Sequence, residues 1–399
     1  MKCVLINSWY QQYSTGKLVY AFRSHMIQQG HSVLTFYGHG NPTTDKNVFL
    51  VGNKYSLYAH ALLCRITGYE GMFSTLNTKK VIKQIEEFKP DVVYLFNLHA
   101  YYLNEYLLLN YLKDSGIKTI YMLFDEYPYL GRCTFAGNCE KYKTQCSDCH
   151  KVHEYPVSMF FDRSKVLFNK KKVLFENWNQ VTLAGVDFLR RGASMSAISK
   201  NTKFIPIDMG VKLKETYYPR EVSKLREKLQ IPENHKIVVT VGPYSDPRKG
   251  IKKLVEIAKI CAKDPITFIN IGFDGDKSKL PDNFIGISYV SDQDELAMYY
   301  SLADVYVMTS SGEAMSLTCM EALGCGCKLI GFNISGTPYA ASEEFGVFVQ
   351  FDDLDAFAEA IRKSDKKTEQ SIKACRDYAL SRYEISDFMR NLEKIGTEN

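Results

Sequence analysis

Short apolar runs alternate with amphipathic segments along most of the chain. In the first half, β-branched and aromatic runs predict strands at 3–6, 32–38, 91–97, 119–124, 181–185 and 204–210. In the second half, similar runs predict strands at 237–242, 266–272, 303–310 and 328–333. Segments with helical spacing lie between them, as where Leu18, Phe22 and Met26 recur before Gly30. Near-continuous apolar strands separated by helices indicate parallel sheets covered on both faces.

Two interruptions of this alternation divide the chain. Residues 125–172 are rich in Cys, Tyr and Lys and have little periodicity, and a polar stretch with prolines precedes the strand at 237. We therefore expect two Rossmann-like α/β domains that face each other across a cleft, at 1–208 with an insert at 125–172, and at 209–378. The helical segment 379–399 is expected to pack back on the first domain.

Composition narrows the class of protein. With 45% hydrophobic and 24% charged residues, the balance is that of a globular protein, and a net charge of +5 is too small to predict a nucleic-acid partner. The apolar run at the N-terminus is too short for a signal peptide, and no run is long enough to cross a bilayer. We expect a cytoplasmic protein whose eleven cysteines are thiols or metal ligands.

The stretch SSGEAMSLTCMEALG holds two carboxylates, Glu313 and Glu321, directly after a predicted strand. Ser316 is expected to cap a helix that starts at Leu317, and the exposed amides of a helix start favour a phosphate. Carboxylates accept hydrogen bonds from sugar and ribose hydroxyls. A sugar nucleotide would use all three groups, whereas the plain alternative is a loop charge and a surface helix residue.

Two further loops contain groups that suit phosphates. After the strand that ends at Gly242, Arg248 and Lys249 precede a helix, where two cations oppose the helix dipole unless an anion neutralises them. The alternative is a solvated basic turn. In the loop after the first strand, Ser14, Thr15 and Gly16 allow close backbone approach, but Leu18 replaces the Ser/Thr of a P-loop, which excludes that motif.

Four cysteines of the insert, Cys133, Cys139, Cys146 and Cys149, have spacings close to those of a zinc knuckle. A long irregular segment needs some fastening, and a structural Zn²⁺ would provide it. The alternative is four reduced thiols packed against the first domain.

Taken together, these motifs resemble family 4 of the retaining glycosyltransferases with the GT-B fold. The E-x7-E pair with EALGCGCKLIGFNISGTP resembles the donor-site signature of that family, and DPRKG resembles its phosphate-binding segment. The first half, with STGK, NLHAYYLN and the cysteine insert, resembles the subgroup that builds bacterial exopolysaccharides and O-antigens.

The resemblance implies a role for each matching residue. The expected catalytic residues are His99, Asp125, Arg248, Lys249 and Glu313. The expected donor-binding residues are Ser14, Thr15, Gly16, Gly242, Arg248, Lys249, Tyr289, Val290, Glu313, Ser316, Leu317 and Glu321. The family needs no metal for its chemistry. Three positions depart from the family pattern: Phe124 replaces a His, Pro243 an Arg and Tyr339 a Glu.

The resemblance implies transfer of a sugar from a nucleotide-sugar donor to a surface glycan, with a lipid-linked acceptor. Peripheral contact with the inner face of the cell membrane is expected, and the aromatic-rich segment 101–113 is one candidate for it. Two other functions stay open. A non-catalytic subunit that binds glycan or a partner protein would tolerate Phe124 and Pro243, and a sugar-nucleotide epimerase shares the fold but needs acid–base groups that the sequence does not place.

Overall fold

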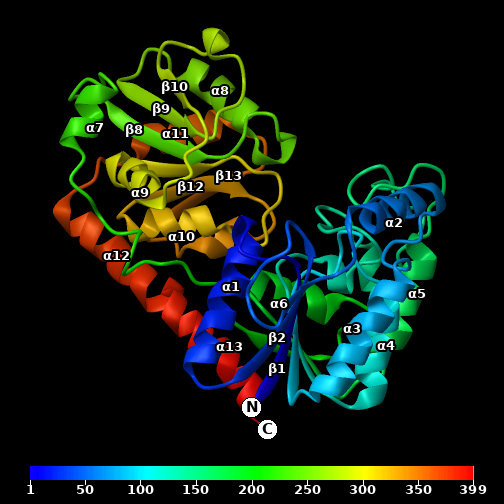
Figure 1. Cartoon of the computed structure of the whole chain (residues 1–399). Coiled ribbons are helices and arrows are strands. Elements are labelled where there is room, and N and C mark those ends of the chain that lie inside the picture. Colours follow the sequence, from blue (N-terminus) through cyan, green and yellow to red (C-terminus); the bar gives the residue numbers. More distant parts are fainter. Residues whose placement is uncertain (399) are drawn as a thin grey trace. The chain divides into compact units, whose positions relative to one another are not determined.

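The computed structural model describes residues 1–398, which form two compact units. Unit 1 comprises Met1–Ile207 and the residues from Met389 onward, and unit 2 comprises Asp208–Phe388 (Figure 1). The chain returns to unit 1 at Met389 rather than at 379. The preceding segment is tied into unit 2, because the Val211 amide donates to the Tyr383 carbonyl at 2.9 Å and the Tyr383 hydroxyl donates to the Ala340 carbonyl at 2.9 Å.

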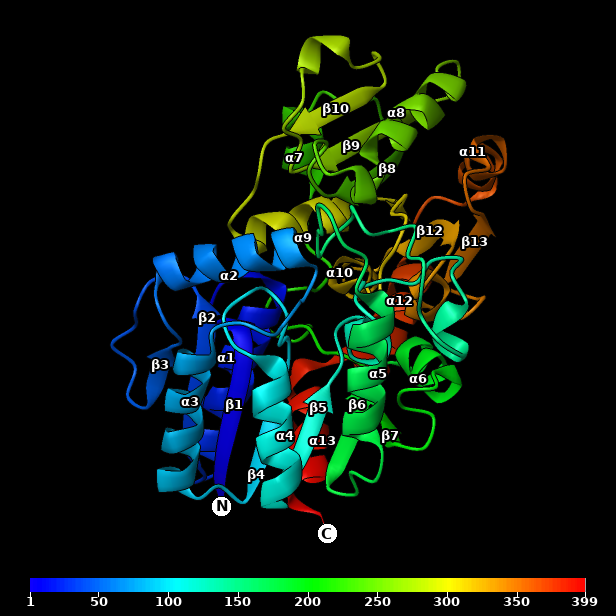
Figure 2. The same cartoon turned by 90° about the vertical axis from the view of Figure 1, so that its right-hand side faces the viewer.

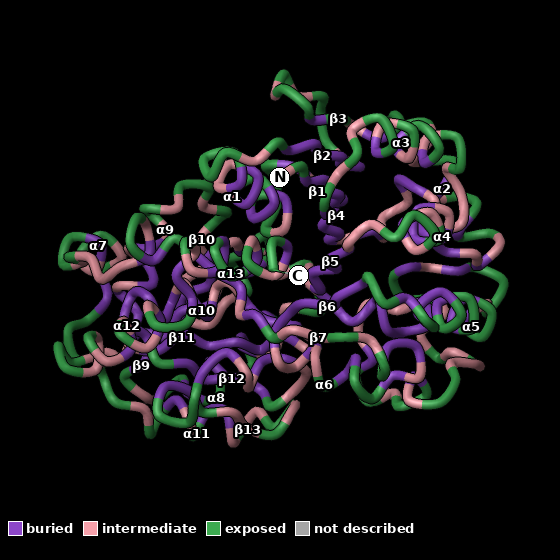
Figure 3. The backbone as a smooth tube through the Cα atoms, turned by 90° about the horizontal axis from the view of Figure 1, so that it is seen from below, coloured by how far each residue is buried: buried purple, intermediate pink, exposed green. Residues whose placement is uncertain are grey.

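Unit 1 is built on a seven-stranded parallel sheet with the order β3-β2-β1-β4-β5-β6-β7. Its strands are β1 (Lys2–Trp9), β2 (Ser32–His39), β3 (Val48–Leu50), β4 (Val92–Leu95), β5 (Lys118–Met122), β6 (Val181–Gly185) and β7 (Lys203–Pro206). The strands at the centre of the sheet are buried along almost their whole length (Figure 3). This burial explains their continuous apolar sequences and confirms the predicted parallel sheet.

Helices cover both faces of this sheet. They are α1 (Tyr13–Gln28), α2 (Lys54–Thr67), α3 (Thr75–Phe88), α4 (Glu105–Ser115), α5 (Ser164–Phe175), α6 (Asp187–Met195) and the end of α13 (Ile385–Thr397). Helices α1 and α13 lie on one side of β1, and α3, α4 and α5 lie on the other (Figures 1 and 2). No helix within residues 1–398 is long and apolar enough to cross a membrane.

The segment 101–113, a candidate for membrane contact in the sequence, is instead core. Its apolar side chains Tyr102, Tyr106, Leu108, Leu109 and Leu112 are all buried in unit 1. The aromatic side chains of α4 therefore pack in the core of unit 1. The prediction that residues 101–113 contact the membrane is wrong.

Buried polar side chains fasten the irregular segment 125–172. Arg132, almost fully buried, donates to the carbonyls of Val152 and Pro156, and Lys171 donates to the carbonyls of Tyr127 at 2.7 Å and Leu130 at 3.1 Å. Because a buried carbonyl without a partner is costly, these two cations replace the backbone ladder that a loop lacks.

Unit 2 repeats the architecture with a six-stranded parallel sheet in the order β10-β9-β8-β11-β12-β13. Its strands are β8 (Lys236–Val241), β9 (Ile266–Ile271), β10 (Phe284–Ile287), β11 (Val305–Met308), β12 (Lys328–Asn333) and β13 (Gly346–Gln350). Its helices are α7 (Ser223–Lys228), α8 (Ile251–Ile260), α9 (Gln293–Leu302), α10 (Leu317–Gly324), α11 (Leu354–Lys363) and α12 (Glu369–Tyr383), and α13 begins in this unit. An apolar core between β8, β11, β12, α8 and α11 includes Val238, Leu254, Ile257, Phe332 and Phe357.

Short 3₁₀ turns occur in both units. They are η1 (Tyr127–Tyr129), η2 (Lys141–Lys143), η3 (Pro247–Lys249), η4 (Lys277–Lys279) and η5 (Thr337–Ala340). Since every strand pair in either sheet is parallel, the loops that follow the strands gather at one edge of each sheet.

Glu70 lies in the core of unit 1, in the connection between α2 and α3. Its carboxyl is buried, and its Oε1 has no hydrogen-bond partner among residues 1–398. Burial, reinforced by the charge of Glu105, raises the pKa of Glu70 to about 7. Because the folded-state pKa is raised, ionisation opposes folding as the pH rises from the unfolded pKa toward 7.

We predict that Glu70→Gln stabilises unit 1 increasingly as the pH rises. The variant should match the wild type near pH 4.5, and it should gain roughly 3 kcal/mol on it by pH 8, since Gln cannot ionise. Both tryptophans, Trp9 and Trp178, lie in unit 1, so tryptophan fluorescence during urea unfolding reports this unit. A difference that does not change with pH would contradict the buried, titrating carboxyl.

Candidate functional site

An ion pair between Lys249 and Glu313 joins two loops at the carboxyl edge of the unit 2 sheet. The Lys249 Nζ lies 2.6 Å from Glu313 Oε1, and the Glu313 side chain is largely buried. Lys249 ends the loop after β8, and Glu313 lies in the loop after β11. The structure therefore brings together two residues that the sequence predicts for one site.

Gly250 makes this approach possible. Its φ is +67°, and a Cβ atom at this position would lie 2.1 Å from the Thr309 carbonyl oxygen at the end of β11. A side chain cannot fit there, so only glycine allows the loop after β8 to lie against β11. The Thr309 hydroxyl also donates to the Lys249 carbonyl at 3.1 Å, which fixes the backbone of Lys249.

Arg248 pairs with a different carboxylate, that of Asp246. Its guanidinium lies 2.8 Å from Asp246 Oδ2 and its side chain is mostly exposed. The Asp246 carboxylate also accepts from the Arg248 amide at 2.9 Å and so caps η3. The sequence analysis missed Asp246, although its place two residues before Arg248 is typical of such a cap. Both cations of the loop are thus paired with carboxylates of unit 2.

Helix α10 starts at Leu317 after Ser316, as predicted, but Ser316 does not cap it with its side chain. The Ser316 hydroxyl is instead within 2.8 Å of the Thr318 hydroxyl. In the body of this helix, Glu321 accepts a hydrogen bond of 2.8 Å from the hydroxyl of Tyr300 on α9. Tyr300 is buried, and it was not predicted from the sequence because nothing in α9 distinguishes it from a core residue.

The other predicted donor residues of unit 2 also lie at strand ends. Gly242 follows β8, and a Cβ atom there would lie 3.3 Å from Lys249 Cγ, so the lysine side chain runs alongside it. Tyr289 and Val290 follow β10, and Tyr289 is strongly exposed. No hydrogen bond or ion pair among residues 1–398 joins either of these two to Lys249 or Glu313.

In unit 1, Ser14, Thr15 and Gly16 form the first turn of α1 rather than a loop before it. Ser14 is exposed, whereas Gly16 is buried. A Cβ atom on Gly16 would lie 3.1 Å from the Trp9 backbone. This glycine therefore lets α1 pack against the end of β1, which is one sufficient reason for a small residue at this position.

His99 and Asp125, which follow β4 and β5, form a hydrogen-bonded pair at 2.8 Å. The other ring nitrogen of His99, Nδ1, lies 3.0 Å from the Tyr155 hydroxyl. Burial lowers the pKa of His99, but the Asp125 carboxylate more than offsets this effect, so the net pKa is raised. Tyr155 was not predicted, because nothing in the sequence indicates that the cysteine-rich segment folds back to His99.

Phe124 stands where the resembled family has a histidine. Its ring stacks on Phe96 with the ring centroids 5.8 Å apart. This position therefore contributes an aromatic contact between the ends of β4 and β5 and no polar group.

The four cysteines of the insert are free thiols. Burial raises the pKa of Cys133 to about 12 and that of Cys146 to about 11, so both are protonated at neutral pH. Within residues 1–398, no three His, Cys, Asp or Glu side chains lie close enough to share a metal ion. Arg132 and Lys171 fasten this segment through backbone carbonyls, and the structural zinc stays a prediction.

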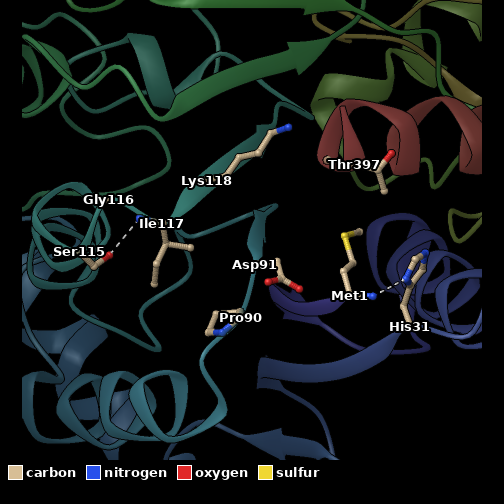
Figure 4. A pocket seen from close by; sticks show the side chains of 10 residues that line it. Met1, His31, Pro90, Asp91, Ser115, Gly116, Ile117, Lys118 and Thr397 are labelled. Atoms are coloured by element: carbon tan, nitrogen blue, oxygen red, sulfur yellow. Dashed lines mark hydrogen bonds between the residues drawn. The ribbon is translucent and has the colours of Figure 1, made fainter. Parts of the chain in front are cut away.

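A cavity of about 650 Å³ lies at the opposite, amino edge of the unit 1 sheet (Figure 4). Its wall includes Met1, His31, Asp91, Lys118 and Thr397, and the Met1 amino group lies 3.1 Å from His31 Nδ1. Met1, His31, Asp91 and Lys118 precede or begin strands, and Thr397 ends α13, whereas His99 and Asp125 follow strands. The cavity is therefore separate from the predicted catalytic residues.

Comparisons with known proteins agree with this description. Residues 221–380 match the family described as glycosyl transferases group 1. A 41.2 kDa protein in the cps region of Klebsiella pneumoniae is 26% identical over 261 residues, which cover 63% of this chain and 61% of that protein. The chain thus spans less than two thirds of the length of this relative.

Solved structures share the whole fold at low identity. WaaG, a glycosyltransferase involved in lipopolysaccharide biosynthesis, matches with a TM-score of 0.66 and 14% identity over 100% of both chains. HepE from Anabaena, solved in complex with UDP-glucose, matches with a TM-score of 0.61 and 13% identity over 98% of both chains. The chain therefore has the GT-B fold of two Rossmann-like units, and the part that matches glycosyl transferases group 1 lies in unit 2.

Proposed function

We propose that the protein is a retaining glycosyltransferase that moves a sugar from a nucleotide-sugar donor to a lipid-linked acceptor in the synthesis of a surface glycan. The observation that carries the proposal is the Lys249–Glu313 pair in front of helix α10, inside the domain that matches glycosyl transferases group 1. A half-buried cation, a carboxylate and a helix start offer the three kinds of contact that a sugar diphosphate needs.

In this proposal each group of unit 2 has its own part of the donor. The amides of Ser316 and Leu317, with Lys249 and Arg248, would hold the diphosphate, and Glu321 would accept from the ribose. Glu313 would accept from sugar hydroxyls. When the glycosidic bond breaks, charge develops on the diphosphate, and a fixed cation with a helix dipole stabilises that charge without rearrangement.

The acceptor proposal rests on unit 1. Contacts at both ring nitrogens hold His99 in one orientation between Asp125 and Tyr155, and we assign this pair a polar role beside the acceptor. UDP-glucose bound to HepE and the lipopolysaccharide role of WaaG support a nucleotide-sugar donor and a surface-glycan product for this chain.

Two observations favour the alternative function, a non-catalytic subunit. Phe124 contributes only a stacking contact, and both Arg248 and Lys249 are neutralised by carboxylates of the protein itself. A binding-only relative would keep such internal pairs and would not exchange them for a diphosphate. Donor binding therefore separates the two functions.

We predict that one member of a panel of UDP-, GDP- and dTDP-sugars stabilises the wild type against heat. At about 100 times its Kd the ligand should add roughly 2.7 kcal/mol to the free energy of unfolding. Lys249→Met should lose most of the ligand-induced shift, because the diphosphate loses its half-buried cation. Lys259→Met removes an exposed charge paired with Glu256 on the same unit, and it serves as the matched control that keeps the shift.

Absence of a shift with every sugar nucleotide would exclude the transferase and favour the binding subunit. A shift that Lys249→Met leaves intact would instead place the donor elsewhere. The stability of each variant without ligand is measured in the same experiment, so loss of folding is not mistaken for loss of binding.

We also predict that Asp125→Asn lowers the pKa of His99. The Asp125 carboxylate favours the charged imidazole, and an amide at this position cannot. The histidine Cε1–H signals in a proton–carbon NMR titration give the midpoint directly, with His99→Gln to assign the resonance. If transfer depends on neutral His99, the acid limb of the activity profile should move to lower pH together with this midpoint. An unchanged midpoint would refute the coupling of the pair.

A further inference from the structure

Helix α2 of unit 1 exposes an unusual amount of apolar side chain. Tyr55 and Tyr58 are each 72% exposed and Leu62 is 56% exposed, while only His60 and Cys64 of this helix are buried. Most surface helices place their apolar residues inward and polar residues outward. The apolar residues of this helix lie largely on its outer side, which nothing among residues 1–398 covers.

The exposed residues form one continuous stripe. Positions 55, 58, 62 and 66 recur at intervals of three and four, which places them on one side of a helix, and Leu63 borders them. Residues His60 and Cys64 belong to the opposite side. The stripe therefore follows the whole 14-residue helix.

Two neighbouring segments extend the stripe. The Met159 amide donates to the Arg65 carbonyl at 2.7 Å, which places the exposed run Met159–Phe161 beside the end of α2. At the other end, the Asn77 side chain donates to Ser56 Oγ at 3.2 Å, and its neighbour Leu76 is 77% exposed. We call this surface the docking face, and it consists of Tyr55, Tyr58, Leu62, Leu63, Ile66, Leu76, Met159, Phe160 and Phe161.

Helix α2 carries positive charge beside the stripe. It contains Lys54 and Arg65, both exposed and on the same flank of the stripe, and it contains no acidic residue. Glu70, which follows the helix, is buried, and the exposed Asp162, which follows Phe161, accepts from the amides of Cys149 at 2.7 Å and Ser164 at 2.8 Å. The surface thus combines protruding apolar side chains with a positive flank along α2.

We propose that the docking face inserts into the headgroup region of an anionic lipid bilayer. Aromatic and aliphatic side chains on one side of a helix with flanking Lys and Arg are the features of helices that lie in a membrane interface. A second copy of the chain fits less well, because a two-fold contact through α2 would bring Lys54 and Arg65 of both copies together, and α2 has no acid to pair them.

The position of the docking face suits the proposed acceptor, and this inference rests on the proposed function. The buried side of α2 leads toward the catalytic pair: the His60 ring lies 5.9 Å from Tyr101, Tyr101 lies 6.2 Å from Tyr155, and Tyr155 contacts His99. Figure 2 shows α2 at the level of the carboxyl ends of β1 and β2. A bilayer on the outer side of α2 would hold a lipid-linked glycan within reach of His99.

Flotation of the full chain with lipid vesicles tests the inference. Wild type should float with vesicles of 30% phosphatidylglycerol in phosphatidylcholine and bind pure phosphatidylcholine at least tenfold more weakly. Leu62→Asp should reduce binding to the anionic vesicles about tenfold or more, since it places a charge in the stripe. Arg65→Glu should reduce it by roughly fivefold for each unit of charge lost at the surface.

Val173→Asp is the matched control, because Val173 is exposed on α5 outside the docking face. It should bind vesicles like the wild type. Equal binding of wild type to neutral vesicles, binding to neither, or equal losses in Leu62→Asp and Val173→Asp would each overturn the proposal. So would dimerisation in sedimentation velocity without lipid that Leu62→Asp abolishes, since the face would then bind a second copy.

The outcome is independent of the donor test. Sugar-nucleotide thermal shifts are measured without vesicles and report unit 2, and Leu62→Asp should keep both its shift and its tryptophan-monitored unfolding. Vesicle binding without any donor shift would refute the transferase and leave the docking face standing. Donor shifts without vesicle binding would support the transferase and refute the docking face.

Discussion

The ion pair between Lys249 and Glu313 is the interaction on which the proposed donor site of unit 2 depends. It exists because a glycine with φ of +67° lets one loop lie against the end of β11, where a side chain would collide with the Thr309 carbonyl. A carboxylate in front of a helix start repels phosphate unless a cation accompanies it. Lys249 supplies that cation and also shields Glu313, so one contact sets both the shape and the charge of the proposed donor site.

In unit 1, buried cations hold an irregular segment in place. Its longest irregular segment has no ladder of backbone hydrogen bonds, and Arg132 and Lys171 satisfy its carbonyls from within. Buried cations of this kind contribute little net stability but are costly to remove. Through Tyr155 the fastened segment reaches His99, and on its outer side Met159–Phe161 extend the apolar surface of α2. The same insert therefore contacts His99 and contributes to the proposed docking face.

The alternation of apolar runs was enough to predict the fold, and the parallel sheets are confirmed. Strands β3, β10 and β13 escaped prediction because they are short edge strands that are only partly buried. The pairing of Lys249 with Glu313 follows from their places after neighbouring parallel strands. Tyr155, Tyr300 and Arg132 could not be predicted, because their contacts depend on the path of an irregular segment or on the packing of helices. Two buried cations fasten the insert, and the zinc expected there stays a prediction.

Calorimetric titration tests the central claim most directly, with a nucleoside diphosphate and then with the corresponding nucleotide sugar. The account assigns the diphosphate to Lys249 and the helix start, and it assigns the sugar to Glu313. Glu313→Gln should therefore bind the nucleoside diphosphate about as well as the wild type and lose the additional affinity that the sugar provides. If the variant loses affinity for both ligands equally, or for neither, Glu313 does not hold the sugar and the proposed division of the site is wrong.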